Sequence, residues 1–108
     1  GIRRRTAAAQ SGASKVRRAA RVDDNHRSIA VALKAIGCSV LSLAPLGKGA
    51  PDLLVGYWGR NTILEVKDGS KPPSKRKLTP DEEAFAEAWR GQYAVVETVE
   101  QAIEAVTA

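Results

Sequence analysis

Three charged residues stand out because they interrupt two short apolar runs. Asp52 opens the run that follows the loop 44–51, and Glu65 and Lys67 close the next run. Two carboxylates that lie close together repel each other unless a cation sits between them, and hard divalent ions such as Mg²⁺ take oxygen ligands. A lysine beside them can orient or deprotonate a water molecule, or neutralise charge that develops on a phosphate. These residue types point to metal-assisted phosphodiester hydrolysis.

The chemistry depends on how the two apolar runs pair. Runs 52–57 and 62–67 are expected to form an antiparallel hairpin around a four-residue turn. Because side chains alternate between the two faces of a strand, Glu65 and Lys67 share one face. The register of the hairpin then decides whether Asp52 joins them.

Two registers bring the acids together. If Tyr57 pairs with Thr62, paired residue numbers sum to 119, and Asp52 and Glu65 become diagonal neighbours about 5–8 Å apart between their Cβ atoms. A slip of two residues gives a sum of 117 and places the two acids directly opposite each other. An even sum would put them on opposite faces of the sheet, and the site would not form.

The same charges also have a plainer interpretation. Glu-x-Lys taken alone is common, and Lys67 could form surface ion pairs with the two acids at a strand end. The complete pattern is more specific: Pro51-Asp52 after a glycine-rich loop, an apolar run, a tight turn, and then Glu65-Val66-Lys67. The backbone carbonyl of Val66 lies between the charged pair and could add an oxygen ligand.

Periodicity and turn residues predict the elements that must position this hairpin. In chain order we expect a helix over 22–37, a strand over 38–43, a loop over 44–51, the two hairpin strands, a basic loop over 68–77, a helix over 79–91, a strand over 93–97 and a helix over 98–106. The order α-β-β-β-α-β-α predicts the α/β class, with a mixed four-stranded sheet flanked by helices.

The first helix is expected to begin at a capping aspartate, Asp23 or Asp24, and to end at Gly37 in a left-handed conformation. Its apolar face has helical spacing, and His26 falls on that face one turn earlier. The face consists of Ile29, Ala30, Leu33 and Ile36.

The second helix has the clearest start signal in the chain. Thr79 caps it, Pro80 occupies the first turn, Glu82 completes a capping box, and Gly91 stops it. The capping role explains Glu82 sufficiently, so we do not assign it to catalysis. The predicted buried stripe of this helix is Phe85, Ala88 and Trp89, and the last helix is expected to be capped by Thr98 with Gln101 three residues on.

Length and composition suit one compact domain with a modest core, since the chain has 108 residues of which 44% are hydrophobic. The single cysteine, Cys38, excludes an internal disulfide and favours an intracellular, cytoplasmic setting. It is expected to be a small buried residue; a nucleophilic role is the weaker alternative, because His26 lies in another element. No apolar stretch approaches membrane-spanning length.

The net charge of +5 is concentrated in residues 1–22, which hold seven basic residues and no acid. This arm is poor in large apolar residues, and we expect it to be a flexible segment preceding a single domain over 23–108. Such an arm suits phosphate contacts with a polyanion. A solvated tail and a mitochondrial transit peptide are the alternatives.

The motifs "GAPDLLVG" and "ILEVKDG" resemble the signature of the PD-(D/E)xK nuclease superfamily, and more narrowly its small standalone VRR-NUC (virus-type replication–repair nuclease) domains. The similarity extends over about residues 23–105. It implies a restriction-endonuclease-like core and a Mg²⁺ or Mn²⁺ site formed by Asp52, Glu65 and the carbonyl of Val66, with Lys67 assisting the water. Similar standalone domains resemble Holliday-junction resolvases, which implies a homodimer.

The chain departs from this pattern on its first helix, where the family often carries a glutamate that points into the site. Here the sequence is "DDNHR". By helical phase His26 is the residue best aimed inward, as a second metal ligand or a phosphate contact, whereas Asp24 or Asn25 would need a different helix start. The alternative for His26 is a histidine bonded to backbone near the cap. A one-metal site is the default. Glu82 stands near the place where relatives often carry glutamine.

Cations near the predicted site are candidates for nucleic-acid binding. Those in the loops that flank Asp52 and Lys67 could hold phosphates on either side of a cut, and one lies at the hairpin tip beside Trp58. These candidates are Lys48, Lys71, Lys75, Arg76, Lys77 and, at the tip, Arg60. Trp58 is expected to be a packing or dimer residue.

The sequence and the resemblance together predict a metal-dependent DNA endonuclease that is selective for branched, Holliday-junction or repair intermediates. No base-reading module is visible in the sequence. A restriction-type or flap nuclease is the alternative within the same chemistry. A non-catalytic nucleic-acid-binding protein with a degenerate metal site is the alternative of another class.

Overall fold

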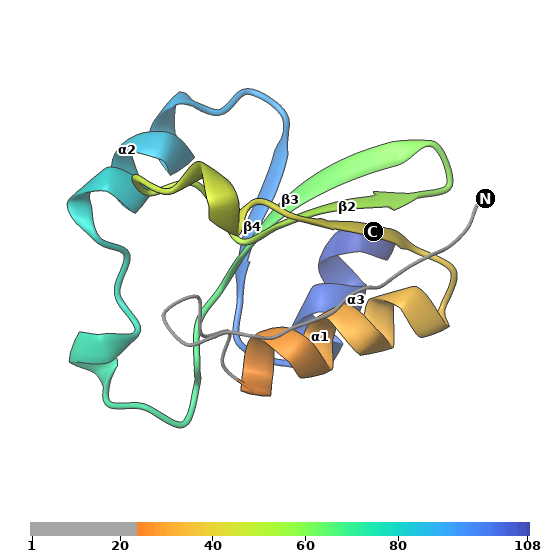
Figure 1. Ribbon diagram of the computed structural model, residues 1–108, viewed down its shortest axis with the longest axis horizontal. Helices are drawn as coiled ribbons and strands as arrows, with labels where there is room; N and C mark the ends of the chain where they lie inside the picture. Colours follow the sequence, from red (N-terminus) through yellow and green to blue (C-terminus); the bar gives the residue numbers. More distant parts are fainter. Residues whose placement is uncertain (1–23) are drawn as a thin grey trace.

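The computed structural model describes residues 24–108 and shows an α/β fold with three helices and one four-stranded mixed sheet (Figure 1). The basic arm predicted over residues 1–22 lies outside the described residues. The elements follow in the order α1 (Asp24–Ala35), β1 (Ser39–Ser42), β2 (Leu53–Tyr57), β3 (Arg60–Val66), α2 (Pro80–Ala88), β4 (Gln92–Val96) and α3 (Val99–Thr107). This order of helices and strands confirms the prediction.

Two short 3₁₀ helices interrupt the loops that were expected to be irregular. They are η2 (Ala44–Leu46), before the glycine-rich segment, and η3 (Pro73–Lys75), within the basic loop. The strands lie in the order β1-β2-β3-β4. β1, β2 and β3 form antiparallel pairs, and β3 and β4 pair in parallel, so the chain from β3 to β4 crosses over and carries α2 on the way.

The central hairpin is tighter than expected. Tyr57 pairs with Arg60, and Leu53 pairs with Leu64, so paired residue numbers sum to 117. The predicted four-residue turn and the 119 register are therefore wrong, and the alternative register is the one observed. The turn consists of Trp58 and Gly59, which have φ angles of 52° and 79°. Positive φ at both central residues is the type I′ pattern, whose twist matches that of paired strands.

One face of the sheet forms the core with α1 and α3, which lie side by side beneath it in Figure 1. The alternating residues of β2, β3 and β4 that point to this side are buried together with α1 and α3 side chains. The buried residues of this layer are Ile29, Leu33, Cys38, Leu53, Val55, Leu64, Val66, Val96, Ala102 and Val106. Ile36 was predicted to join them, but it lies beyond the end of α1 and is 39% exposed.

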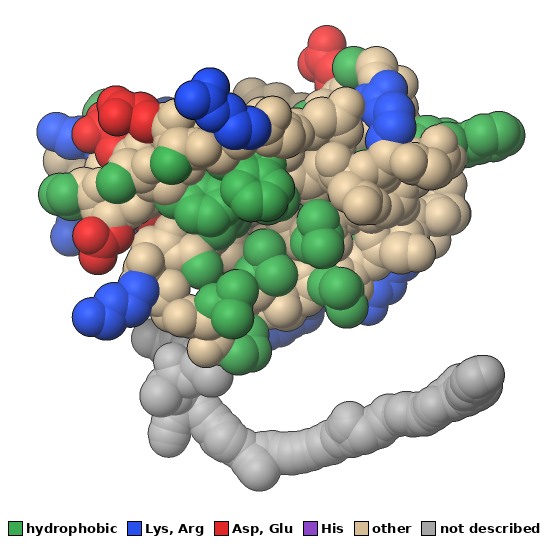
Figure 2. All heavy atoms as spheres, turned by 90° about the horizontal axis from the view of Figure 1, so that it is seen from above, with side chains coloured by type: hydrophobic (Ala, Val, Ile, Leu, Met, Phe, Trp, Pro, Cys, Tyr) green, Lys and Arg blue, Asp and Glu red, His purple; other side chains and the backbone are tan. Residues whose placement is uncertain are grey.

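The opposite face of the sheet is only partly covered. α2 lies on this side, and none of its residues is fully buried. Of its predicted buried stripe, Phe85 stacks on Trp89 with ring centroids 5.4 Å apart, but Trp89 is 44% exposed and Ala88 is exposed. Hydrophobic side chains gather on the surface in the view of Figure 2. α2 therefore borders an open apolar surface instead of sealing a second core.

The predicted N-caps of α2 and α3 are present, but α2 ends at Ala88, with Trp89 as its C-cap, so the prediction that Gly91 stops this helix is wrong. The Thr79 side chain accepts a hydrogen bond from the backbone N–H of Glu82, and the Glu82 side chain accepts one from the N–H of Thr79. Thr98 caps α3 by accepting from the N–H of Gln101. Gly37 follows α1 with a φ of 98°, the left-handed conformation that glycine adopts without steric cost. In residues 24–108 no helix has the length and apolar character needed to cross a bilayer.

Candidate metal-binding site

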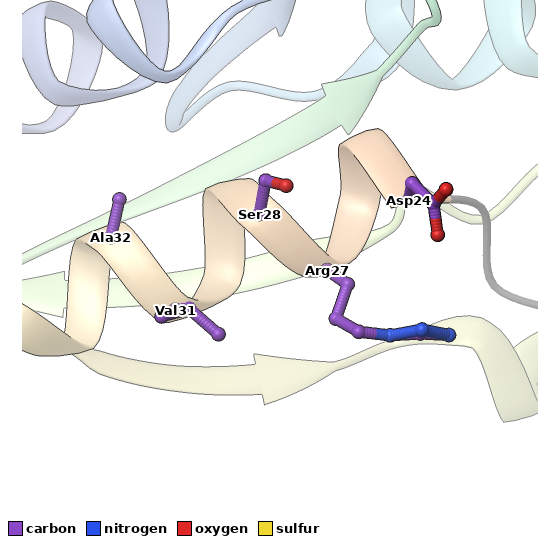
Figure 3. Close-up of a pocket in the computed structure, with 5 residues that line it drawn as sticks. All are labelled: Asp24, Arg27, Ser28, Val31 and Ala32. Carbon is purple, nitrogen blue, oxygen red and sulfur yellow. The ribbon is translucent and has the colours of Figure 1, made fainter.

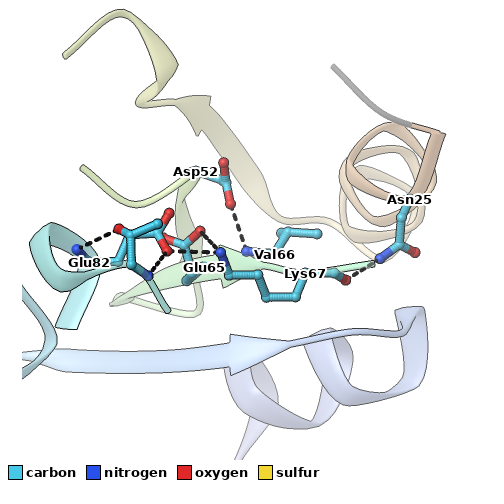
Figure 4. Close-up of polar contacts among 7 residues, drawn as sticks. Asn25, Asp52, Glu65, Val66, Lys67 and Glu82 are labelled. Carbon is cyan, nitrogen blue, oxygen red and sulfur yellow. Dashed lines mark hydrogen bonds and ion pairs between the residues drawn. The ribbon is translucent and has the colours of Figure 1, made fainter. Parts of the chain in front are cut away.

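Asp52 lies at the start of β2, where the hairpin ladder changes. Its backbone N–H donates to the carbonyl of Leu64 over 3.1 Å, while Leu53 is the ladder partner of that same residue. Two residues thus oppose one, as in a β-bulge, which redirects a side chain away from strict alternation. The Asp52 carboxylate consequently turns to β3 and accepts the backbone N–H of Val66 over 2.7 Å (Figure 4).

Glu65 is the buried acid of the site. It points to the α2 side of the sheet, is 3% exposed, and its Oε1 has no hydrogen-bond partner among the described residues. Burial raises the pKa of Glu65 to about 8, and the charge of Asp52, a hydrogen bond with Asp52 and the charge of Glu82 act in the same direction. The two carboxyl groups are therefore close neighbours, as expected, although the bulge makes their arrangement different from a simple cross-strand pair.

Lys67 supplies the positive charge next to these acids. Its ammonium Nζ lies 3.8 Å from Glu65 Oε2 and 2.8 Å from Glu82 Oε1. The attraction of Lys67 lowers the pKa of Glu65, but this effect is smaller than the burial and repulsion that raise it. The nearer partner, Glu82, is a residue that sequence reasoning assigned only to a helix cap.

The backbone of Val66 faces the Asp52 side of the site. In a strand, the N–H and C=O of one residue point to the same neighbouring strand. Because the Val66 N–H donates to Asp52, its carbonyl also points towards β2. Asp52, Glu65 and this carbonyl therefore bring oxygen atoms to one end of the hairpin.

The first helix contributes a residue other than the one predicted to aim inward. Asn25 Nδ2 donates to the carbonyl of Lys67 over 2.7 Å and to the carbonyl of Glu97 over 2.9 Å. It thus joins α1 to the ends of β3 and β4. His26 is partly buried and does not form a group of three with Asp52 and Glu65, so its role as a ligand or phosphate contact stays a prediction. A shift of one residue in the start of the helix was the signal that could have indicated Asn25.

Tyr93 is a further residue of the site that sequence reasoning missed. It pairs with Ile63 and therefore lies on the same face of the sheet as Glu65. Its hydroxyl is buried without a hydrogen-bond partner in the described part of the chain. Burial raises the pKa of Tyr93 to about 12, and the charge of Glu65, followed by those of Glu82 and Asp52, adds to the shift. Two buried oxygen atoms on this face, Glu65 Oε1 and the Tyr93 hydroxyl, thus lack hydrogen-bond partners among residues 24–108.

The site presents oxygen atoms, the donor type that hard divalent cations take. Within residues 24–108 no cluster of three or more His, Cys, Asp or Glu side chains has metal-ligand geometry. Mg²⁺ nevertheless needs few protein carboxylates, since water and phosphate complete its octahedron. Glu65 Oε1 has no hydrogen-bond partner among the described residues, and burial together with the charge of Asp52 raises the pKa of Glu65. A cation between Asp52 and Glu65 would give Glu65 Oε1 a partner and would offset the repulsion between the two carboxyl groups.

The predicted nucleic-acid contacts lie in three separate segments of the chain. Lys48 is exposed in the glycine-rich loop, and Lys71, Lys75, Arg76 and Lys77 belong to the loop between β3 and α2. Arg76 is already engaged, because it donates to the carbonyl of Lys71 over 2.7 Å and pairs with Glu97 at 3.5 Å. Arg60 is exposed at the hairpin tip beside Trp58, which is 86% exposed. The two loops precede Asp52 and follow Lys67 in the chain, and their role in phosphate binding stays a prediction.

Two hollows lie outside the carboxylate site. One, of about 400 Å³, is an apolar groove between the sheet and α2, lined in part by Leu54, Ile63, Phe85 and Trp89. The other, of about 610 Å³, is an open hollow along the outer side of α1 (Figure 3). Its lining residues are Asp24, Arg27, Ser28, Val31 and Ala32, none of which is a predicted site residue.

Comparison with protein-family models, curated proteins and solved structures finds no match to this chain. Evidence for a function must therefore come from the residues of the site and their geometry.

Proposed function

We propose that this protein is a divalent-metal-dependent nuclease that hydrolyses phosphodiester bonds in DNA. The observation that carries the proposal is the meeting of Asp52, Glu65 and Lys67 at one end of the hairpin, with Glu65 buried and one of its oxygens unpartnered. Two adjacent carboxylates do not stabilise a core, because burying them without a compensating positive charge costs free energy. A binding site for a cation accounts for the arrangement.

Asp52, Glu65 and the Val66 carbonyl would hold Mg²⁺ or Mn²⁺. When bound there, such an ion supplies Lewis-acid stabilisation of the charge that builds up on a phosphodiester under attack by water. The chain must first release the proton that the raised pKa of Glu65 retains at neutral pH. Glu65 is 3% exposed, and this burial strengthens electrostatic interactions at its position.

Lys67 acts on the reacting groups directly. Its ammonium is a donor to a phosphate oxygen or to the attacking water, and its position 3.8 Å from Glu65 keeps it beside the carboxylates. Its partial exposure, 14% for the side chain, leaves room for a substrate oxygen to approach. Lys67 thereby orients the nucleophile and offsets negative charge.

DNA is the proposed substrate because cations border the site on both sides. Lys48 precedes Asp52, and the basic loop follows Lys67. We further propose a restriction-endonuclease-like core, an intracellular, cytoplasmic setting, action on branched or repair intermediates, and a homodimer that presents two sites to such a junction. The basic arm, residues 1–22, supplies seven more cations for non-specific phosphate contacts.

The test is a panel of labelled four-way, flap, nicked and linear duplexes incubated with Mg²⁺, Mn²⁺ or Ca²⁺. We expect cleavage with Mg²⁺ or Mn²⁺, strongest on branched DNA, that is abolished by Glu65→Ala and kept by Glu104→Ala, an exposed control on α3. A preference for flap or linear duplexes would indicate the other nuclease types. DNA binding without cleavage of any substrate under any metal would overturn the enzymatic proposal in favour of a binding protein.

A further inference from the structure

The first turn of α2 contacts both chain segments that carry the site. Glu82 binds the Lys67 ammonium over 2.8 Å, two residues after Glu65 on β3. The preceding residue, Asp81, packs against Gly49 in the loop before Asp52, so closely that a Cβ at Gly49 would lie 2.5 Å from the Asp81 Cβ. Because Gly49 also has a φ of 80°, only glycine fits this approach.

Glu82 is itself held in a fixed position. Its Oε1 accepts the backbone N–H of Thr79 over 2.9 Å, and its own N–H donates to the Thr79 hydroxyl over 3.2 Å. The same Oε1 therefore receives two hydrogen bonds, one from the helix start and one from Lys67. Lysine has a flexible four-carbon stem, so its ammonium is located only where a fixed acceptor holds it.

The two possible acidic partners of Lys67 are not equivalent. The ammonium lies 1.0 Å nearer to Glu82 than to Glu65, given distances of 2.8 and 3.8 Å. A lysine released from Glu82 would be free to fold onto Glu65 and occupy the place where a cation would bind. Held as it is, Lys67 lies beside Glu65 and leaves Glu65 Oε1 without a partner.

We infer that Glu82 is a positioning residue for Lys67, which rests on the proposed function. The capping box of α2 fixes Glu82, and Glu82 fixes the lysine that acts on the substrate. A helix start is thereby part of the active-site framework, although Glu82 itself is assigned no contact with substrate.

Glu82→Gln separates this role from helix capping. Glutamine also serves at this position of a capping box, so the helix start is kept while the charge that attracts Lys67 is removed. Glu83→Gln is the matched control, because Glu83 is the next residue of the same turn and is exposed. Glu82→Ala, which removes both contacts, is the second variant.

The experiment measures the full-length chain in two ways. The first is the ¹⁵N spectrum of lysine ammonium groups, in which an immobilised, hydrogen-bonded ammonium exchanges slowly enough to be seen; Lys67→Arg assigns the signal. The second is steady-state cleavage with Mn²⁺. We expect Glu82→Gln to lose the Lys67 signal and to lower kcat about 10- to 100-fold, with KM and Tm close to those of Glu83→Gln.

An unchanged Lys67 signal in Glu82→Gln, or a lost signal with unchanged kcat, would overturn the inference. So would a fall in kcat that Glu83→Gln reproduces. Failure of the proposed function looks different, since the wild-type chain would then cleave nothing before any substitution is made. In that case the ammonium spectrum of Glu82→Gln still decides whether Glu82 positions Lys67.

Discussion

Burial has opposite energetic effects on the two faces of the sheet, as two neighbouring residues of β3 show. Leu64 and Glu65 are consecutive in β3 and almost equally inaccessible, at 0% and 3% exposure. Leu64 joins the apolar layer beneath α1 and α3, where burial is favourable. Glu65 lies on the α2 side, where burial and a second carboxylate raise its pKa to about 8. Burial therefore stabilises the fold at Leu64, whereas at Glu65 it disfavours the charged form of the carboxyl group.

The largest effect is expected when the charge at Glu65 is removed, which tests whether Glu65 is buried for function and not for stability. Glu65→Gln keeps the shape of the side chain but should lower cleavage at least about 100-fold, the loss typical when one stabilising group of a transition state is removed. Mn²⁺ binding by calorimetry should weaken in parallel. Thermal stability without metal should stay the same or rise at pH 8, because the repulsion with Asp52 is gone. A marked loss of stability would mean that Glu65 is structural.

Substitution of the adjacent residue, Leu64, should lower stability and leave metal binding intact. Leu64→Ala removes a fully buried side chain from the core and should lower the free energy of unfolding by about 2–5 kcal/mol, measured by urea denaturation. Mn²⁺ binding should persist at temperatures where the variant is folded. Leu41→Ala is the control, because Leu41 is 60% exposed and should change stability little. Equal effects of Leu64→Ala and Leu41→Ala would contradict the assignment of the core.

The pH dependence of stability should reveal the raised pKa of Glu65. Its pKa rises from the ordinary 4.5 to about 8 on folding, so the folded chain retains a proton that the unfolded chain releases. The Glu65 contribution is thus greatest below pH 4.5 and falls as pH rises to about 8. Tm measured in EDTA should decline across this range, and Glu65→Gln should flatten the decline. A profile that Glu65→Gln leaves unchanged would contradict the shift.

Tyr93 gives the smallest expected effect on stability. Its buried hydroxyl has no partner in the described part of the chain, so Tyr93→Phe removes a polar atom that gains nothing from folding. Stability by urea denaturation should be unchanged or higher by about 1 kcal/mol. Tyr57→Phe is the control, because Tyr57 lies on β2 beside the hairpin turn and its hydroxyl is not a buried atom without a partner. A loss of stability in Tyr93→Phe alone would show that the hydroxyl has a structural partner.

Much of the fold could be predicted because local signals agree with it. The Thr79–Glu82 capping box, the Thr98 cap and Gly37 determine helix ends through contacts within a few residues. Alternation and an odd register predicted that Asp52 and Glu65 would lie close together, although the β-bulge at Asp52 was not predicted. Such features depend on spacing along the chain, which the sequence displays directly.

The errors arose where distant segments decide the outcome. The type I′ turn needs Trp58 at a φ of 52°, an unfavourable conformation for a bulky residue, so composition favoured a longer turn. The Lys67–Glu82 pair and the place of Asn25 depend on how α2 and α1 dock at the sheet, and no local pattern specifies this. The exposure of Trp89 likewise follows from the incomplete cover that α2 gives.

The parallel pairing of β3 with β4 has a consequence for the order of folding. Asp52 and Glu65 meet as soon as a local hairpin closes, whereas Glu82 and Tyr93 reach them only after the long crossover has formed. During that interval the two carboxyl groups face each other before Glu82 is in place beside Lys67. Refolding is therefore expected to quicken when protons or divalent ions are present to neutralise them, and the cation proposed for the site would then also aid assembly.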